Sequence, residues 1–372
     1  MSKSFPLSLL GLSSIALMAA GTARAEVIYE NQSGGSATFY GQFDPSWTQF
    51  DDGADSHGKI VDNSKSNSRV GFTLKQPFSA FELGFKFETA LGFRQGASVS
   101  QLDAPDALEW DRTKLRHVDL SLKSAQYGTF FIGQGSMGWD SIGDRSLSPT
   151  TLVNDVSISD TSGSYLLRQD DGALSEIAVG DAFNNFGGNR RGRIRYDSPD
   201  FGGFVFRTSY GRNILVHEDD DDYWDVALSY DREMANGNQV SAGIGYYVRD
   251  RGDGQEDIKD SFASAAVKLA SGVNAAMAIG SRDNGGSYSY VQLGYIGQWV
   301  AWGDTSLAVD YYKGEDMVSE GDDAESWSLS VVQNVASLNT DIYAGYRSYD
   351  YDDDATSYQK AESVTIGARW KF

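Results

Sequence analysis

The chain has 372 residues, no cysteine, and a formal net charge of −21 from 52 acidic and 31 basic side chains. The lack of cysteine excludes a disulfide framework, a thiol nucleophile and a cysteine metal site, and the acidity argues against nucleic acid as a partner. Mean hydropathy is −0.39, and no long apolar run follows residue 25. This excludes a helical membrane protein but leaves a transmembrane barrel, whose strands alternate between lipid and water.

The N-terminal segment has the features of a secretory signal peptide. Lys3 supplies a positive start, residues 5–20 are apolar, and an A-R-A sequence at 23–25 matches a cleavage site. The apolar stretch is shorter than the roughly 18 residues that a membrane span needs. We therefore expect residues 1–25 to be removed on export and residues 26–372 to form one domain.

Alternation of apolar and polar residues recurs along the rest of the chain. Near the C-terminus, Val364, Ile366 and Trp370 share one face of an extended strand, and Thr365 and Arg369 share the other. Aromatic residues often end the apolar stripe, where a membrane interface would hold them. Sixteen such segments occur, and an even number closes an antiparallel barrel. The expected strands cover residues 37–50, 67–76, 81–94, 112–124, 128–136, 189–197, 204–213, 223–233, 239–250, 261–270, 273–283, 287–299, 304–313, 325–335, 339–350 and 362–372.

The connections between these strands alternate in length. Short links at 76–80, 235–238 and 271–272 are typical of periplasmic turns, whereas the links around 218–222 and 350–354 are longer and acidic. The sequence therefore predicts an all-β fold, a 16-stranded antiparallel transmembrane β-barrel with its loops on one side.

One connection, residues 137–188, is about fifty residues long. A loop of that length in a compact domain is normally functional or disordered. Inside a barrel, one place for such a loop is the lumen.

Five segments and the last residue resemble parts of a known family. The segments are residues 38–44 (TFYGQFD), 68–72 (SRVGF), 116–123 (RHVDLSLK), 127–133 (YGTFFIG) and 194–204 (IRYDSPDFGGF). In this order they are similar to the first strand, the second strand, the two strands before the third loop, and a strand–turn–strand motif of the Gram-negative general porins. The last match is the sharpest, and the terminal Phe372 is similar to the assembly signal of such barrels.

The resemblance implies a homotrimer whose third loop, here residues 137–188, folds into the pore and forms a constriction. In the family, acidic groups on that loop face arginines on the barrel wall. By position, Arg69 and Arg116 match wall arginines of the family pattern. The alternation of the sixth strand adds three lumen-facing arginines. These are Arg191, Arg193 and Arg195.

For Arg116, the alternation along its strand disagrees with the position implied by the resemblance. It falls on the same face as Val118 and Leu120, which should contact lipid. Either a bulge turns it inward or it lies beyond the apolar band. An alternative for each wall arginine is a solvated residue, or a rim residue that pairs with lipid phosphate.

The acidic side of the constriction is expected on the long loop. The candidates are Asp140, Asp144, Asp155 and Asp160, and simple solvation is the alternative for each. Opposed rows of fixed charge would impose a transverse field that aligns polar solutes. The acidic loop-tip motif of the enterobacterial members is absent, and Gln134 replaces a frequent wall arginine, so the details of the constriction depart from the pattern.

These features predict an outer-membrane porin for passive diffusion of ions and small hydrophilic solutes, surrounded by lipid and lipopolysaccharide. No cofactor is expected, although the acidic outer loops are candidate sites for divalent cations that bridge to lipopolysaccharide. The acidic loops favour cations near the mouth, whereas the arginines favour anions at the waist. A substrate-specific channel for a sugar or an organic anion is an alternative that sequence does not separate from a general one.

Two alternatives come from other classes of protein. A secreted carbohydrate-binding β-protein would use the tyrosines and tryptophans as stacking platforms, but it does not explain the sixteen-fold rhythm. A barrel enzyme would need a nucleophile and a base. The chain has only His57, His117 and His217, and it contains neither a G-x-S-x-G nor an H-E-x-x-H motif, so we expect no catalysis.

Overall fold

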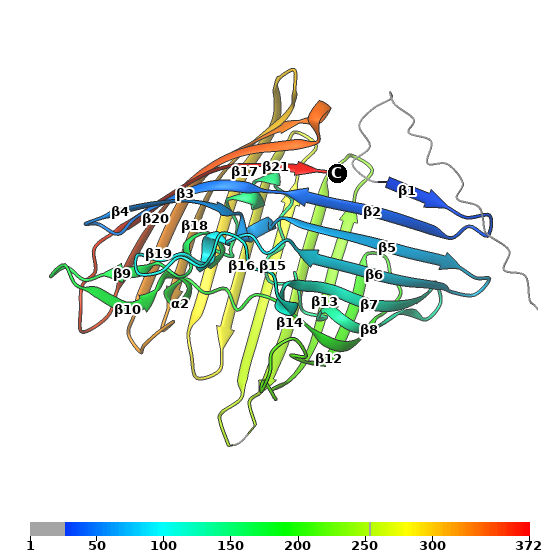
Figure 1. Ribbon diagram of the computed structural model, residues 1–372, viewed down its shortest axis with the longest axis horizontal. Coiled ribbons are helices and arrows are strands. Elements are labelled where there is room, and N and C mark those ends of the chain that lie inside the picture. Colours follow the sequence, from blue (N-terminus) through cyan, green and yellow to red (C-terminus); the bar gives the residue numbers. More distant parts are fainter. Residues whose placement is uncertain (1–26, 253) are drawn as a thin grey trace, which may run out of the picture.

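The computed structural model describes residues 27–252 and 254–372, and β-strands make up most of it (Figure 1). The strands are β1 (Val27–Glu30), β2 (Ser36–Phe43), β3 (Pro45–Asp51), β4 (Ser56–Asp62), β5 (Arg69–Pro77), β6 (Glu82–Ala90), β7 (Leu115–Ser124), β8 (Gly128–Ser136), β9 (Leu166–Arg168), β10 (Leu174–Ala178), β11 (Arg190–Asp197), β12 (Phe204–Arg212), β13 (Asp222–Glu233), β14 (Gln239–Asp250), β15 (Ile258–Lys268), β16 (Val273–Arg282), β17 (Ser287–Val300), β18 (Gly303–Glu315), β19 (Asp323–Val335), β20 (Thr340–Asp352) and β21 (Ala361–Lys371). All of these except β1 and the β9–β10 pair close by antiparallel pairing into a 16-stranded barrel, as the sequence predicted. β2 with β3 forms the first wall strand, and β4 with β5 forms the second.

The second wall strand is longer than the sequence predicted. The expected strand at 67–76 corresponds to β5 alone, and β4 falls in a segment expected to be a loop. β4 pairs with β3 in continuous register, with His57 opposite Phe50. Its sequence, SHGKIVD, lacks the alternation on which the prediction depended, because Lys59 and Ile60 are both exposed neighbours.

Side chains alternate between two environments along the wall strands. On β13, Trp224, Val226 and Leu228 are 41%, 37% and 40% exposed, whereas Asp225 and Ser229 are buried. A soluble protein shows the opposite arrangement, with apolar residues inside. The outer surface is therefore suited to lipid, and the polar residues face the lumen.

Connection lengths alternate along the chain, as expected. Short turns at 78–81, 125–127 and 269–272 join strands at one end of the barrel, and much longer loops at 91–114 and 137–189 join strands at the other. Among the residues that the structure describes, no helix is long and apolar enough to cross a membrane.

The barrel closes between its first and last strands. β21 pairs with β3 and, at Gln42 and Phe43, with β2. Phe372 exchanges two backbone hydrogen bonds with Gly41, at 2.8 and 3.0 Å. A Cβ atom on residue 41 would lie 2.5 Å from the Phe372 ring, so the close approach of the terminal residue requires glycine there. β1 pairs with the part of β2 that extends beyond this seam.

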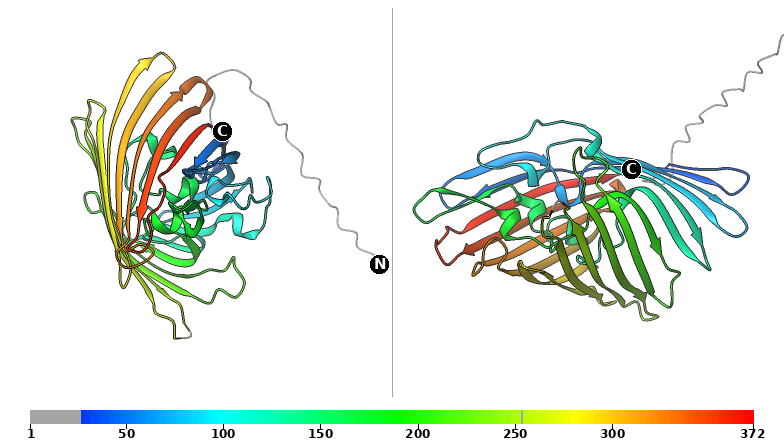
Figure 2. Two further views of the ribbon diagram at one scale, coloured as in Figure 1. Left: turned by 90° about the vertical axis from the view of Figure 1, so that its left-hand side faces the viewer. Right: turned by 90° about the horizontal axis from the view of Figure 1, so that it is seen from below.

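The long connection between β8 and β11, residues 137–189, lies inside the barrel and is called the inner loop below (Figure 2). It contains the 3₁₀ turn η4 (Pro149–Leu152), the short helices α1 (Ser159–Ser162) and α2 (Val179–Ala182), and the β9–β10 hairpin. The loop buries its apolar residues against the inside of the wall. Without this packing, those residues would be exposed to the water in the lumen.

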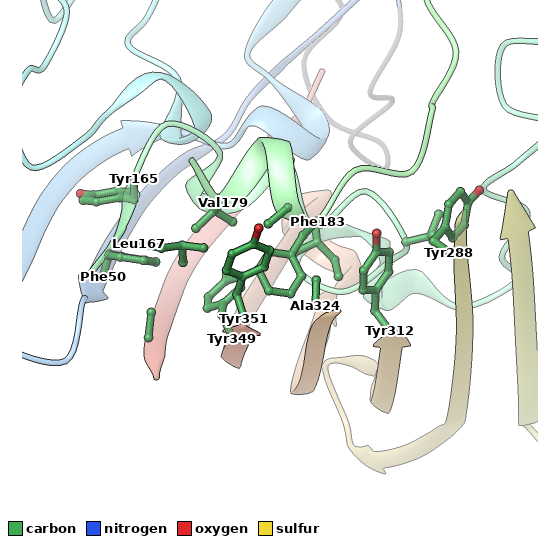
Figure 3. Packing of buried hydrophobic residues seen from close by; sticks show 14 of the residues in the cluster. Phe50, Tyr165, Leu167, Val179, Phe183, Tyr288, Tyr312, Ala324, Tyr349 and Tyr351 are labelled. Atoms are coloured by element: carbon green, nitrogen blue, oxygen red, sulfur yellow. The ribbon is translucent and has the colours of Figure 1, made fainter. Parts of the chain in front are cut away.

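An aromatic cluster fixes the inner loop to one side of the barrel (Figure 3). Phe183 of the loop is fully buried between Tyr312 of β18 and Tyr349 of β20, with ring centroids 5.9 and 5.4 Å away. Tyr165 of the loop stacks on Phe50 of β3 at 4.4 Å. The Tyr312 and Tyr349 rings pack against the loop while their hydroxyl groups bond to the Asn184 carbonyl (2.7 Å) and to Ser363 (3.0 Å).

Polar contacts reinforce the same side. Asn154 of the inner loop accepts hydrogen bonds from Tyr290 (3.2 Å) and from Gln292 (3.0 Å) on β17. Below them, Arg347 of β20 pairs with Asp310 of β18 at 2.6 Å, and both side chains are buried. Pairing satisfies these charges where water does not reach them.

The tip of the inner loop also reaches the last outer loop. The backbone amide of Gln359 donates to the carbonyl of Arg168 (2.8 Å), and that of Asp170 donates to the carbonyl of Ser357 (3.0 Å). The Arg168 guanidinium forms two hydrogen bonds with Asp52, at 3.0 and 2.8 Å, between β3 and β4. The β9–β10 hairpin is thus held by segments from both ends of the chain.

Candidate functional site

The base of the inner loop is held by charged groups on the wall. Arg195 of β11 donates to the carbonyl oxygens of Ser136 (3.2 Å) and Met137 (2.9 Å), where the loop leaves β8. On the other side, the Gly138 amide donates to Asp225 (3.1 Å) and to Ser209 (2.8 Å). These bonds fix the direction in which the loop enters the lumen.

Beyond this base, the loop and the wall enclose a polar cavity of about 480 Å³, called the constriction cavity below. The wall contributes basic side chains from the starts of β5, β7 and β11. The loop contributes three of the four predicted acidic residues. The charged lining residues are Lys65, Arg69, Arg116 and Arg190 on the wall, and Asp140, Asp144 and Asp160 on the inner loop.

Glu88 of β6 organises the basic side of the constriction cavity. Its carboxylate lies 2.6 Å from the Arg116 Nε, 3.8 Å from the Arg69 Nε and 3.7 Å from the Lys86 Nζ. It also accepts a hydrogen bond from the Tyr40 hydroxyl at 2.8 Å. One buried carboxylate therefore holds three cations in place, and the group keeps an excess of positive charge.

The position of Arg116 follows from a β-bulge. Glu88 pairs with His117, but the next residue, Thr89, pairs with Leu115, so Arg116 is an extra residue in β7. The bulge reverses the alternation at this point. It turns Arg116 to the lumen while Val118 stays on the outer face. The bulge therefore explains why strict alternation placed Arg116 on the wrong face.

Arg190 was not among the predicted wall residues. By strict alternation it shares the outward face of Ile194, but it starts β11 and lines the constriction cavity with Arg116. Among the described residues, no carboxylate lies within ion-pair distance of Arg190. Sequence reasoning overlooked it because alternation is a weak guide at the first residue of a strand.

Lys65 is the second residue that sequence reasoning did not find. It follows Ser64 in a 3₁₀ turn, η1 (Ser64–Ser66), that interrupts the second wall strand. Its ammonium group lies 2.5 Å from Asp155 of the inner loop and 2.6 Å from the Ser157 carbonyl. Asp155 is therefore a partner that fixes the loop to the wall and is not among the residues that line the constriction cavity.

Arg193 and Arg195 also have contacts that differ from those expected, and neither lines the constriction cavity. Arg193 is 5% exposed, pairs with Asp119 at 2.6 Å and donates to the Ser136 carbonyl. Arg195 pairs with Asp197 at 2.7 Å. Alternation correctly predicted that both side chains face the lumen. It could not show that both guanidinium groups are paired with carboxylates and bonded to carbonyl oxygens where the inner loop leaves β8.

Arg191 also faces the lumen but lies to the side of the constriction cavity. Its guanidinium carbon is 4.1 Å from the ring centroid of Tyr223 on β13, a cation–π geometry. It lines a neighbouring cavity together with Arg116 and Arg190. Of the five predicted basic residues, Arg69 and Arg116 are thus in the constriction cavity and Arg191 is next to it.

Two of the loop carboxylates, Asp144 and Asp160, lie in surroundings that favour their protonated forms. Burial, together with the nearby charges of Asp155 and Asp140, raises the pKa of Asp144 to about 7. Burial and, more weakly, Asp155 raise the pKa of Asp160 to about 6, against the opposing effect of Lys65. Asp144 and Asp160 therefore titrate closer to neutral pH than an ordinary aspartate does.

A family model described as Gram-negative porin matches residues 11–354. The chain belongs to the Gram-negative porin family. No curated protein sequence matches it significantly. Membership decides between the classes considered above: the protein is an outer-membrane porin, a channel through which small solutes diffuse, and not a soluble sugar-binding β-protein.

Solved structures share the fold of this porin. The anion-selective porin from Comamonas acidovorans is 17% identical with a TM-score of 0.60, and the match covers 91% of this chain and 100% of that one. OprB from Pseudomonas putida is 9% identical with a TM-score of 0.62, covering 90% and 94%. OmpF from Salmonella typhi is 14% identical with a TM-score of 0.54, covering 93% and 100%.

Proposed function

We propose that the constriction cavity is the part of the channel that selects among solutes. The observation that supports this is the meeting of Arg69, Arg116 and Arg190 with Asp140, Asp144 and Asp160 in one cavity within the lumen. Charges of opposite sign on facing sides create a transverse field across the water between them. A polar solute aligns with that field, whereas an apolar solute must displace ordered water.

Within this proposal, Arg193 and Arg195 position the inner loop and do not contact solutes. Their hydrogen bonds to the Ser136 and Met137 carbonyl oxygens hold the point where the loop leaves the wall. Asp155 does the same from the loop side through Lys65.

The experiment is single-channel recording of the purified porin in a planar bilayer under a salt gradient. We expect Arg190→Gln to move the reversal potential toward cation preference and Asp140→Asn to move it toward anion preference. Each variant removes one charge from one side of the constriction cavity, and Arg212→Gln, at the outer rim, is the matched control. Equal reversal potentials for all four proteins would contradict the proposal.

We infer a homotrimer in contact with lipid and lipopolysaccharide. The apolar outer face of the barrel supports membrane contact, and one structural neighbour, OmpT of Vibrio cholerae, has a trimer form. Conductance steps that arrive in threes, together with a heat-sensitive trimer band on gels, would support this assembly. Single steps from a protein that cross-links only as a monomer would contradict it.

Export through a cleaved signal peptide stays part of the proposal, and residues 1–25 lie outside the described residues. N-terminal sequencing of the protein from outer membranes should begin at Glu26. An N-terminus that still contains residues 1–25 would contradict cleavage.

Divalent cations at the acidic outer loops also stay a prediction. In the part of the chain that the structure describes, no group of three or more histidine or acidic side chains could hold a metal ion. Bridging would therefore need phosphate oxygens from lipopolysaccharide as the remaining ligands. An unchanged melting temperature after chelation of the trimer in lipopolysaccharide would contradict it.

We propose that this porin acts by diffusion alone, without catalysis. The three histidines are not grouped: His117 lies 3.6 Å from Asp119 on β7, and His57 of β4 lies 3.8 Å from Asp52. Hydrolysis of an ester or peptide substrate that is lost in a His117→Gln variant would contradict this.

A further inference from the structure

A second cavity, of about 460 Å³, adjoins the constriction cavity and is called the basic recess below. The two cavities share Asn67, Arg116 and Arg190. The basic recess differs from its neighbour in charge, because Lys114, Arg116, Arg190 and Arg191 line it and no Asp or Glu does. It is therefore a pocket of positive charge beside the path through the constriction.

The guanidinium groups of the basic recess have donors to spare. The Nε atoms of Arg190 and Arg191 are buried and have no hydrogen-bond partner among the described residues. Arg191 makes one side-chain hydrogen bond, to the Arg190 carbonyl at 2.8 Å, and Tyr223 stacks beneath it. Stacking on Tyr223 fixes the plane of the Arg191 guanidinium group. Its remaining N–H groups therefore lose little conformational freedom when they bind a ligand.

Gln134 adds a neutral polar group to the same wall. It is 5% exposed, it lines the basic recess, and its side-chain oxygen has no partner in the described part of the chain. A buried amide without a partner costs free energy. The unpartnered atom is an acceptor, which an anionic ligand cannot satisfy, so Gln134 contributes to the basic recess only as a neutral polar lining residue.

Part of the lining of the basic recess is apolar, and this part is called its apolar side below. Leu115 of β7 contributes from the wall, and Leu215 and Val216 contribute from the outer loop between β12 and β13. Val216 is 46% exposed in the described structure. The loop approaches closely because Ile214 packs over Gly192, where a Cβ atom would lie 2.6 Å from the Ile214 side chain.

We propose that the basic recess binds organic monocarboxylates with an apolar body, of which benzoate is the simplest probe. The carboxylate would lie between Arg190 and Arg191, and the ring would lie against Leu215 and Val216. The inference rests on the proposed function only in that the protein must form a channel. The volume suits a small ligand, and charge-assisted hydrogen bonds to guanidinium are the strong kind.

This chemistry separates carboxylates from other anions and from sugars. Inorganic phosphate would use the arginines but leave the apolar side without a contact, and it must lose more hydration. A sugar would leave the guanidinium donors without an anionic acceptor. Arg116 is already paired with Glu88, so most of the binding falls on Arg190 and Arg191.

The test is titration of benzoate into a single open channel carrying potassium chloride. We expect benzoate to lower the current in a saturable manner at concentrations at least tenfold below those at which acetate, inorganic phosphate or benzyl alcohol acts. Arg191→Gln should raise the half-blocking concentration about tenfold, the loss expected for one charged hydrogen bond. Arg249→Gln is the matched control, because Arg249 also lies over Tyr223, at 5.8 Å, but does not line the basic recess.

A second variant tests the apolar side. Leu215→Asn with Val216→Asn should weaken the effect of benzoate and leave that of acetate unchanged. Equal potency of benzoate and phosphate, or a half-blocking concentration of benzoate that is unchanged in Arg191→Gln, would overturn the proposal. A normal salt conductance without any benzoate effect would overturn this inference alone, whereas a folded trimer without conductance would overturn the proposed function as well.

Discussion

The inner wall of the barrel has two sides that differ in what covers them. From β16 to β21 the wall is rich in tyrosine, the inner loop covers it, and Arg347 there is fully paired with Asp310. From β5 to β8, with β11, the wall is rich in arginine, and Arg190 faces open cavities without a carboxylate partner among the described residues.

The comparison teaches that the partner, and not the residue type, decides what a lumen arginine does. Arg347 and Arg193 are buried and paired, so they hold structure together. Arg190 and Arg191 line the basic recess and have no carboxylate partner among the described residues, so their guanidinium groups are available to a solute. The aromatic cluster holds the loop to the tyrosine-rich side, and the arginines without a carboxylate partner lie on the other side.

An arginine-to-glutamine substitution should lower stability strongly on the covered side and hardly at all on the arginine-rich side. Arg347→Gln should lower the free energy of unfolding by about 3–5 kcal/mol, because it leaves Asp310 buried and unpaired. Arg190→Gln should change it by less than about 0.5 kcal/mol, since no ion pair is lost. Denaturant unfolding in detergent measures both. A larger destabilisation by Arg190→Gln would contradict the comparison.

Removing the central aromatic ring should loosen the covered side. Phe183→Ala should remove about 3 kcal/mol of contact with Tyr312 and Tyr349, because it opens a cavity in a packed cluster. We expect noisier single-channel current and faster proteolysis within the inner loop. Tyr127→Ala, at a turn residue that is 65% exposed, is the control, and a quiet channel in the Phe183 variant would count against this view of the loop.

Acidification should sharpen the difference between the two sides. The pKa of Asp144 is about 7 and that of Asp160 about 6, so both carboxylates take up protons as the pH falls from 8 to 5. The arginines keep their charge, and the reversal potential should therefore shift toward anion preference. Asp144→Asn should remove the upper part of this shift and should resemble acidified wild type already at pH 8. A pH-independent reversal potential would contradict the assignment.

The smallest effect is expected at the rim, which belongs to neither side. Arg212 pairs with Asp222 at an exposed position on β12 and β13. Solvent and salt screen such a pair. Arg212→Gln should leave the melting temperature and the reversal potential equal to those of the wild type within experimental error. A clear change in the reversal potential would show that the rim also contributes to ion selectivity, and a clear change in the melting temperature would contradict the weakness of this pair.

The barrel was predictable because its signal is repeated. Alternation sets the face of most residues on the wall strands, as Trp224 and Val226 illustrate, and the matching connection lengths set the strand count. The site was less predictable, because it lies where that regularity ends. Arg116 enters the lumen through a bulge, Arg190 is the first residue of its strand, and Lys65 belongs to a turn inside a strand.

Pairing was also hidden from the sequence. Alternation turned Arg193 and Arg195 inward, but Asp119 and Asp197 are set beside them only by the register of the folded sheet. Similarly, Asp155 looked equivalent to Asp144 until the fold placed it against Lys65. A pattern of charges along the chain indicates which groups enter the lumen, and only the three-dimensional arrangement decides which of them remain unpaired.

The contact between the β9–β10 hairpin and the last outer loop has a consequence for assembly. Gln169 and Gln359 are in contact although 190 residues separate them, and the second of these precedes the final strand. This contact can form only once the segment that precedes the final strand is in place. A barrel that still lacks its last hairpin therefore lacks this contact with the inner loop. The β9–β10 hairpin reaches its final position in the same step that closes the barrel.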